Sequence, residues 1–338
     1  MKKNKCHICN QFCSKSKKTL NLPNLKFISG TGKLVGVSKK YSFCQNSYFI
    51  NTINNQVWKK NIKKIYSNYN FNEKGIPKHS LTREKIIYEK IKNLNLKINK
   101  VLEIGPGNGQ LIKKLNKIKR INTIDAYDIN KKNLNIFRKI KKFNNFYLEL
   151  QKIDSKYDLI ILSHSIFHIT RLHESFDTIS KLLKKDSHIL IITPDPYEYP
   201  ILPYVFEISW FSSSENIVNY LNRFNLYLKF NFKKLLKNEI VILITNKKKI
   251  RLKKDKNFLK KFIDLQKKFK NKINSLKKEK SLIIHGAGIN GLFLYYNLKK
   301  NIFKIYDDNF KVKIKNNNKL LYKKIKKIKS FHLNKIIN

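Results

Sequence analysis

Apolar runs alternate with helical patterns through the middle of this chain. Strands are predicted where short apolar runs occur, and helices where apolar residues recur every three or four positions. The predicted strands are residues 101–104, 123–128, 157–162, 188–193 and 239–244, and the helices between them are residues 110–115, 133–140 and 174–183. Alternating strands and helices are typical of a mostly parallel, doubly wound sheet, so we expect an α/β core.

The segments on either side of this core follow other patterns. Strand-like pieces at residues 41–44 and 47–50 belong to a cysteine-bearing N-terminal part, and a helical pattern at residues 81–94 leads into the core. In the Lys-rich stretch 253–280, apolar residues share one face, which predicts a linker helix packed on a domain. These residues are Phe258, Phe262, Leu265, Phe269, Ile273 and Leu276.

A second and smaller α/β unit is predicted near the end of the chain. Residues 281–308 follow the order strand, glycine-rich turn, helix and strand. We therefore divide the 338 residues into an N-terminal domain, a core domain, a linker helix and a small C-terminal domain. Their ranges are 1–62, 63–248, 249–280 and 281–338.

The formal net charge of +51 raises the question of a polyanionic partner, because Lys and Arg neutralise phosphates. The excess is nearly all Lys and is scattered along the whole chain among abundant Asn and Ile. Arg, which is better suited to bidentate phosphate contacts, occurs only six times. This pattern indicates a bias in amino-acid usage, so we expect a small-molecule substrate rather than a nucleic acid.

The chain carries no predicted membrane or export signal. No stretch approaches the roughly 20 apolar residues that a membrane span needs. The charged N-terminus lacks the apolar run of a secretory signal peptide. These features predict a soluble, cytoplasmic protein without a membrane partner.

All four cysteines lie within the first 44 residues. Cys6 and Cys9 have the two-residue spacing that lets two thiolates bind one tetrahedral zinc ion. Cys44 would begin a second such pair, but position 47 is Ser, so Cys13 or His7 would supply the fourth ligand. The cluster Cys6, Cys9, Cys13 and Cys44 therefore predicts a structural zinc site, with unliganded thiols as the alternative.

A glycine-rich turn follows the first core strand and opens the first core helix, at Glu103-Ile104-Gly105-Pro106-Gly107-Asn108-Gly109. Glycines permit a tight turn there and let a ligand lie against bare backbone. About 20 residues further on, the next strand ends at Asp128, whose carboxylate can accept both hydroxyls of a ribose. An NAD site or a plain strand–helix turn would also suit glycines alone.

The acid before the glycines, the Pro between them and the acid ending the next strand together resemble the first two motifs of class I S-adenosylmethionine-dependent methyltransferases. Residues 157–169 resemble the fourth-strand region of the same family. The resemblance implies a Rossmann-like core that binds S-adenosylmethionine, with the glycine loop at the methionine portion and Asp128 at the ribose. The implied cofactor-binding residues are Glu103, Gly105, Gly107, Asn108, Gly109, Asp128 and Ser163.

Three further segments resemble a methyltransferase family that includes sugar C-methyltransferases. The cysteine-bearing N-terminus resembles its zinc-binding domain, and His285–Gly291 resembles the glycine turn of its C-terminal domain. Tyr204–Ser212 resembles the signature Tyr-x-Glu/Asp-His-x-Ser-aromatic-Phe-Ser. The resemblance implies a zinc-knuckle-like N-terminal domain, a small Rossmann-like C-terminal domain, and methyl transfer to carbon in a nucleotide-linked sugar or related small metabolite.

One departure from the signature concerns the catalytic base. The family's His, proposed as the general base, is Glu207 in this chain, whereas Tyr204 is retained. Glu207 could remove a proton next to a carbonyl if burial raises its pKa. His168, which matches the family's His after the fourth strand, is the other candidate base.

We therefore expect an S-adenosylmethionine-dependent methyltransferase in which C-methylation is favoured and O- or N-methylation remains open. One alternative is an RNA methyltransferase that uses the basic surface. The other is a nucleotide-binding protein without methyl transfer, in which Gly286–Gly291 is the main site.

Overall fold

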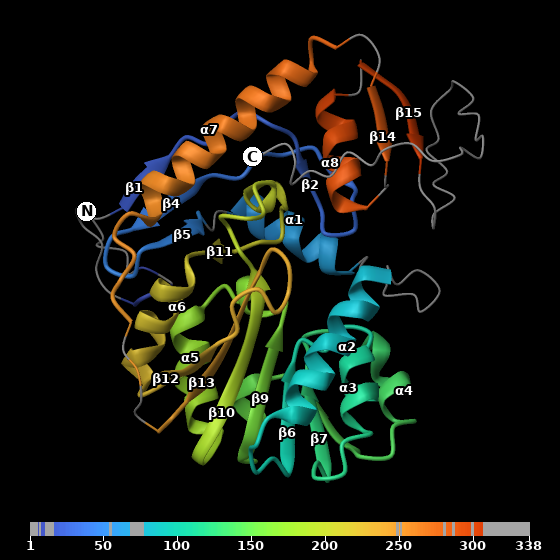
Figure 1. The fold of residues 1–338 in the computed structure, drawn as a ribbon, viewed down its shortest axis with the longest axis vertical. Coiled ribbons are helices and arrows are strands. Elements are labelled where there is room, and N and C mark those ends of the chain that lie inside the picture. Colours follow the sequence, from blue (N-terminus) through green and yellow to red (C-terminus); the bar gives the residue numbers. More distant parts are fainter. Residues whose placement is uncertain are drawn as a thin grey trace.

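The computed structural model describes most of the chain and shows a layered α/β molecule (Figure 1). The described residues are 6, 8–10, 17–53, 56–67, 78–247, 250, 252–279, 282–285, 288–298 and 301–306. A large sheet forms the lower half of the view, and an N-terminal sheet crossed by a long helix forms the upper half.

The large sheet has seven strands and confirms the predicted fold class. Its order is β12-β13-β10-β9-β6-β7-β8, and β10, β9, β6, β7 and β8 are parallel neighbours. β13 runs antiparallel to both β10 and β12. The strands are β6 (Lys100–Ile104), β7 (Thr123–Tyr127), β8 (Phe143–Tyr147), β9 (Tyr157–Ser163), β10 (Leu183–Pro194), β12 (Tyr227–Asn231) and β13 (Glu239–Thr245).

Helices cover both faces of this sheet, as its continuous apolar runs require. Within β9, Leu159 and Ile161 face one core while Ile160 and Leu162 face the other, so every residue of the run is buried. The first core is closed by α2 (Lys78–Asn93), α3 (Gln110–Leu115) and α4 (Leu134–Phe137), and the second by α5 (Leu172–Lys181) and α6 (Ser214–Leu221). Short 3₁₀ helices are Lys131–Asn133, Leu150–Lys152, Ile166–His168, Leu202–Tyr204 and Asn222–Phe224.

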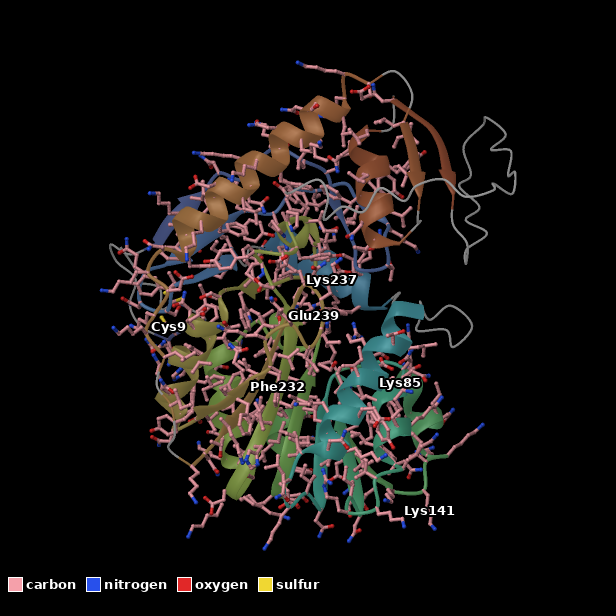
Figure 2. All side chains as sticks on the ribbon, viewed as in Figure 1. Cys9, Lys85, Lys141, Phe232, Lys237 and Glu239 are labelled. Carbon is pink, nitrogen blue, oxygen red and sulfur yellow. The ribbon has the colours of Figure 1, made fainter. Side chains whose placement is uncertain are left out.

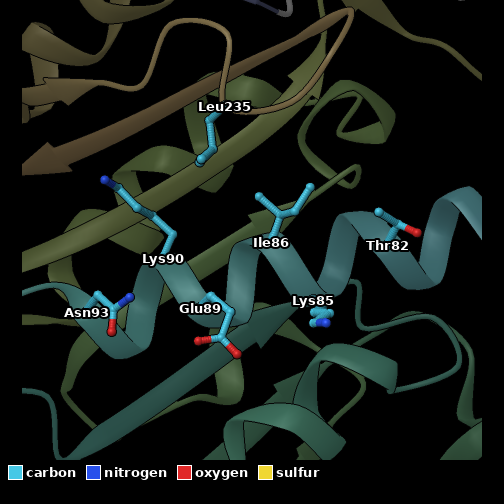
Figure 3. Close-up of a pocket in the computed structure, with 7 residues that line it drawn as sticks. All are labelled: Thr82, Lys85, Ile86, Glu89, Lys90, Asn93 and Leu235. Carbon is cyan, nitrogen blue, oxygen red and sulfur yellow. The ribbon is translucent and has the colours of Figure 1, made fainter.

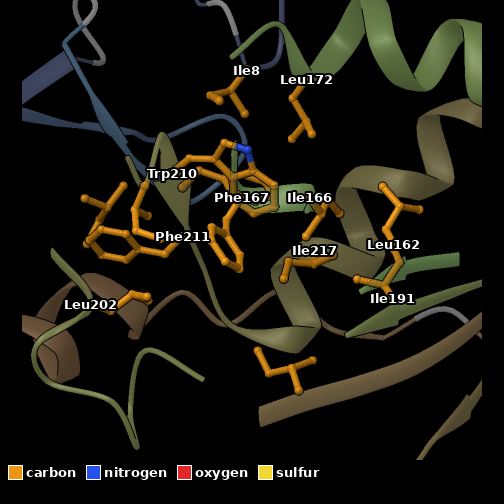
Figure 4. Packing of buried hydrophobic residues seen from close by; sticks show 14 of the residues in the cluster. Ile8, Leu162, Ile166, Phe167, Leu172, Ile191, Leu202, Trp210, Phe211 and Ile217 are labelled. Carbon is orange, nitrogen blue, oxygen red and sulfur yellow. The ribbon is translucent and has the colours of Figure 1, made fainter. Parts of the chain in front are cut away.

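The N-terminal sheet is completed by a strand from the core domain. Its antiparallel order is β1-β4-β5-β11, in which Trp210 pairs with Asn51 and Phe211 pairs with Ile50. A single hydrophobic core runs from this sheet into the second core of the large sheet (Figure 4). The elements of this part are β1 (Lys17–Leu20), β2 (Phe27–Ile28), β3 (Leu34–Val35), β4 (Tyr41–Cys44), β5 (Phe49–Thr52), α1 (Gln56–Ser67) and β11 (Trp210–Phe211).

The predicted amphipathic helix is confirmed as α7 (Phe258–Leu276). Its buried stripe is Phe258, Phe262, Gln266, Phe269 and Ile273, while Lys260 and Lys267 are exposed on the other side. Figure 1 shows α7 lying across the N-terminal sheet, and the rings of Phe262 and Phe211 are 4.9 Å apart. The helix is therefore part of the shared core.

The end of the described chain forms a small unit beside α7. It contains β14 (Leu282–His285) and β15 (Ile302–Tyr306), which pair in parallel, and α8 (Ile289–Leu298). Across the described part of the chain, no helix is both long and apolar enough to span a membrane.

Removal of the Phe262 ring should destabilise the protein strongly. The ring is fully buried between α7 and β11, so we expect Phe262→Ala to lower the free energy of unfolding by about 3–5 kcal/mol in urea denaturation. The matched control is Lys260→Ala on the exposed face of the same helix, with a change within about 0.5 kcal/mol. Equal stabilities of the two variants would show that α7 is not part of the core.

Candidate cofactor and acceptor site

The glycine loop forms the tight turn between β6 and α3. Gly105 has φ 72°, and a Cβ built there would lie 2.6 Å from the Cβ of Ser165. Gly109 also has φ 72°, and its Cβ would lie 2.2 Å from the ring of Phe137. Any side chain at these positions would require both backbone strain and displacement of a neighbour. The glycines thus allow both the left-handed backbone of the turn and its close packing against Ser165 and Phe137.

Glu103 precedes the loop inside β6 and is 2% exposed. Its Oε2 atom is buried and has no hydrogen-bond partner among the described residues. Burial raises the pKa of Glu103 to about 8, with a further raising effect of Glu84 and an opposing effect of Arg83. A buried carboxyl group of this kind suits a ligand that brings a positive charge.

Asp128 lies at the same edge of the sheet as the loop, because Ile104 and Tyr127 are paired in the parallel strands β6 and β7. Its Oδ1 accepts a hydrogen bond of 2.9 Å from the backbone N–H of Asn130. Burial raises the pKa of Asp128 to about 6. The glycine turn, Glu103 and Asp128 thus lie together at the carboxyl edge of the sheet.

The carboxyl edge holds the predicted Ser163 and also Glu239, which the motifs did not reveal. Ser163 ends β9, and the next residue, His164, has φ 55° and lies 3.0 Å from Glu239 between Nε2 and Oε2. Glu239 begins β13, and Figure 2 shows it near the middle of the molecule, above the large sheet. Since β13 is antiparallel to β10, its first residue lies where β10 ends. Glu239 could have been predicted at this edge only if the antiparallel direction of the last strand had been recognised. The charge of Arg83 on α2 acts to lower the pKa values of both Glu103 and His164.

The structure brings His168 and Glu207 together. His168 Nδ1 lies 3.3 Å from the backbone oxygen of Glu207 and 3.0 Å from the hydroxyl of Tyr66. Glu207 is 1% exposed, and its Oε1 accepts a hydrogen bond of 2.7 Å from Gly30 N–H. Its Oε2 has no hydrogen-bond partner among the residues described. Burial raises the pKa of Glu207 and lowers the pKa of His168 to about 4, so His168 is neutral at pH 7.

Tyr204 lies apart from these two residues in its side-chain contacts. Its ring packs in an aromatic cluster with Phe27, Phe269 and Phe293, and its hydroxyl donates to the backbone oxygen of Pro23 at 3.4 Å. The side chain is fully buried. Its contacts are those of a core residue that joins the N-terminal part to α7 and α8.

The backbone around Glu207 is held mainly by the N-terminal part of the chain. We call residues 205–212 the clamped segment. The buried ammonium group of Lys39 donates to the backbone oxygens of three residues of the clamped segment. Further hydrogen bonds to the segment come from β2, β5, α1 and the turn before β5. The contacts made by Lys39 are Val205 O (2.7 Å), Phe206 O (3.3 Å) and Ile208 O (2.9 Å).

Three cysteines form a separate buried cluster. The sulfur atoms of Cys6, Cys9 and Cys44 lie within 4.8 Å of one another, and those of Cys9 and Cys44 are 3.6 Å apart. Three convergent thiols have the donor chemistry that zinc prefers. Cys13 and Gly286 lie outside the described residues.

A surface groove of about 480 Å³ lies away from these groups, along α2 (Figure 3). Ile86 and Leu235 supply apolar side chains, and Lys85, Glu89 and Lys90 supply polar ones. None of the residues that line this groove was predicted to bind the cofactor or to take part in catalysis.

Comparisons with known proteins identify the family of the core domain. A model of the methyltransferase domain family matches residues 52–238. No curated protein sequence matches the chain. Mitomycin 7-O-methyltransferase is 12% identical, with 49% of this chain and 53% of that chain covered and a TM-score of 0.43, so the match spans about half of that enzyme.

Two further solved structures are S-adenosylmethionine-dependent methyltransferases. The protein from Clostridium acetobutylicum is 17% identical, with 56% of this chain and 97% of that chain covered and a TM-score of 0.40. The protein from Mesorhizobium loti is 12% identical, with 46% and 94% covered and a TM-score of 0.39.

Ligand affinity at Glu103 should increase with pH. Below its pKa of about 8 the carboxyl group is protonated, whereas a ligand amino group requires the ionised form. We expect the affinity for S-adenosylhomocysteine to rise about tenfold between pH 6.5 and pH 8, measured by isothermal titration. In Glu103→Gln the affinity should be lower and nearly independent of pH over this range. A pH-independent wild-type affinity would contradict this role of Glu103.

Proposed function

Because the chain belongs to the methyltransferase domain family, we propose that it transfers the methyl group of S-adenosylmethionine to carbon in a small acceptor, a nucleotide-linked sugar or related metabolite. The observation that carries the proposal is the left-handed glycine turn with two buried acids at one sheet edge. Glu103 would bind the amino group of the cofactor, the Gly105–Gly109 loop would lie against its methionine portion, and Asp128 would accept hydrogen bonds from the ribose. Ser163 would border the same edge.

The bound cofactor supplies an electrophilic methyl group. Glu207 would remove the proton from the carbon next to a carbonyl of the acceptor, leaving an enediolate. The enediolate carbon would then form the new bond to the methyl carbon as the bond from sulfur to that carbon breaks. Alignment of the two reactants provides most of the rate, and the base adds a smaller factor.

The surroundings of Glu207 and His168 favour Glu207 as the base. Burial raises the pKa of the Glu207 carboxyl, which strengthens it as a base, and its Oε2 is still without a partner among the described groups. Burial lowers the pKa of His168 to about 4, which weakens this imidazole as a base. His168 Nδ1 faces Tyr66 and the Glu207 backbone, so Nε2 is the nitrogen that could orient an acceptor.

A structural zinc ion at Cys6, Cys9 and Cys44 is the second part of the proposal. These side chains are at most 2% exposed and converge on one point. The ion would hold the first residues of the chain against the turn that joins β4 to β5.

Asp128→Ala should lose most of the affinity for S-adenosylhomocysteine. A carboxylate that accepts ribose hydroxyls contributes about 1.5–3 kcal/mol, so we expect binding about 10- to 100-fold weaker in isothermal titration. Asp154→Ala, an exposed acid elsewhere in the core domain, is the control and should bind as the wild type does. A folded wild-type protein that does not bind S-adenosylhomocysteine would refute the cofactor assignment.

Glu207→Gln should retain cofactor affinity and lose turnover. If Glu207 is the base in C-methylation, kcat should fall by about 10²–10⁴-fold, measured as tritiated methyl transfer to keto-sugar nucleotides. Glu198→Gln, an exposed Glu in the same connection, serves as control and should keep full activity. Because Glu207 also accepts from Gly30, thermal unfolding of both variants must be compared. Unchanged turnover in Glu207→Gln would exclude it as the base.

A further inference from the structure

The two cysteine turns of the N-terminal part have the same backbone geometry. In the first turn, Asn10 N–H donates to Cys6 O at 2.7 Å, and Asn10 has φ 55°. In the second turn, Tyr48 N–H donates to Cys44 O at 2.7 Å, and Tyr48 has φ 58°. Each turn thus starts at a cysteine and ends four residues later in a left-handed residue.

This repetition identifies the counterpart of Cys9. Cys9 is the fourth residue of the first turn, and Ser47 is the fourth residue of the second. Ser47 is 6% exposed, and its Oγ makes no hydrogen bond of normal geometry to any described residue. A buried hydroxyl without a hydrogen bond is costly unless it has another partner.

Side chains of the core domain link the two turns to each other. The guanidinium of Arg223 donates to Cys9 O at 3.4 Å and to Asn46 O at 3.5 Å, so it bridges the two turns. The hydroxyl of Tyr220 donates to Ile8 O at 2.5 Å in the first turn. The core domain therefore holds the four positions of the site together from the side of α6.

We propose that Ser47 occupies the fourth coordination position of a three-thiolate zinc site. The inference rests on the zinc ion of the proposed function and assigns the ligand that completes it. A serine hydroxyl stays protonated at neutral pH and is a weaker donor than a thiolate, and structural zinc sites are normally closed by four strong ligands. The ion is therefore bound more weakly than in an all-cysteine site, and replacement of Ser47 by Cys strengthens the binding.

The test is metal binding by the full-length protein and by Ser47→Cys. Zinc affinity is measured by competition with a chromophoric chelator, and the cobalt-substituted forms are compared by their thiolate-to-cobalt charge-transfer absorbance. We expect Ser47→Cys to bind zinc at least about tenfold more tightly and to show higher charge-transfer absorbance per cobalt. Ser187→Cys, which adds a thiol at a buried serine of β10, is the matched control and should resemble the wild type.

Two variants address other sources of the fourth ligand. Cys13→Ser and His7→Ala should leave the zinc affinity and the cobalt spectrum unchanged. Loss of affinity in either variant, with no gain in Ser47→Cys, would overturn the assignment of Ser47. A wild-type protein that binds neither metal would overturn the site as a whole, and titration with S-adenosylhomocysteine would show separately whether the cofactor proposal stands.

Discussion

The clamped segment depends on one buried cation. A chain segment inside the protein must find donors for its carbonyl groups, because water is absent there. Lys39 meets this need with a single ammonium group that contacts three backbone oxygens of the segment. The same nitrogen lies over the rings of Tyr41 and Phe206, 5.0 and 6.0 Å from their centres. Burial lowers the pKa of Lys39, and the nearby carboxylate of Glu207 opposes this effect. The position of Glu207 is thus set by a residue from the N-terminal part.

The cofactor side of the site follows a different electrostatic rule. Glu103 is buried, and one of its carboxyl oxygens has no hydrogen-bond partner among the described groups. Its neutral form is therefore favoured until a cationic ligand binds. An acid with a raised pKa in the folded state makes the folded protein less stable as the pH rises from about 4.5 toward 8. A bound amino group would remove this cost. Stability of the free protein and ligand affinity therefore change in opposite directions over this pH range.

The sequence predicted those parts of the molecule that depend on local pattern. Five strands of the large sheet (β6, β7, β9, β10 and β13), the glycine loop and α7 were visible in apolar runs, spacing and periodicity, because these features reflect burial of neighbouring residues. The edge strand β12 was not predicted. The half-exposed strand β8, with the sequence Phe-Asn-Asn-Phe-Tyr, lacks such a run and was not predicted. Lys39, Arg83 and Glu239 were also missed, since each acts through contacts with residues far away in the sequence. In a chain with 73 Lys and Arg, nothing local marks Lys39 as the Lys that is buried among the described residues.

The same long-range contacts connect the cysteine cluster to the acceptor side. Cys44 begins the turn that ends at Tyr48, and the backbone oxygen of Tyr48 accepts a hydrogen bond of 2.6 Å from Ser212. Ser212 closes the clamped segment, and β11 within it pairs with β5 directly after the turn. A metal ion that orders the turn would therefore stabilise the strand pairing that positions Glu207. The N-terminal part is better regarded as one wall of the candidate site than as an independent domain, because the strand that completes its sheet follows immediately after the proposed base.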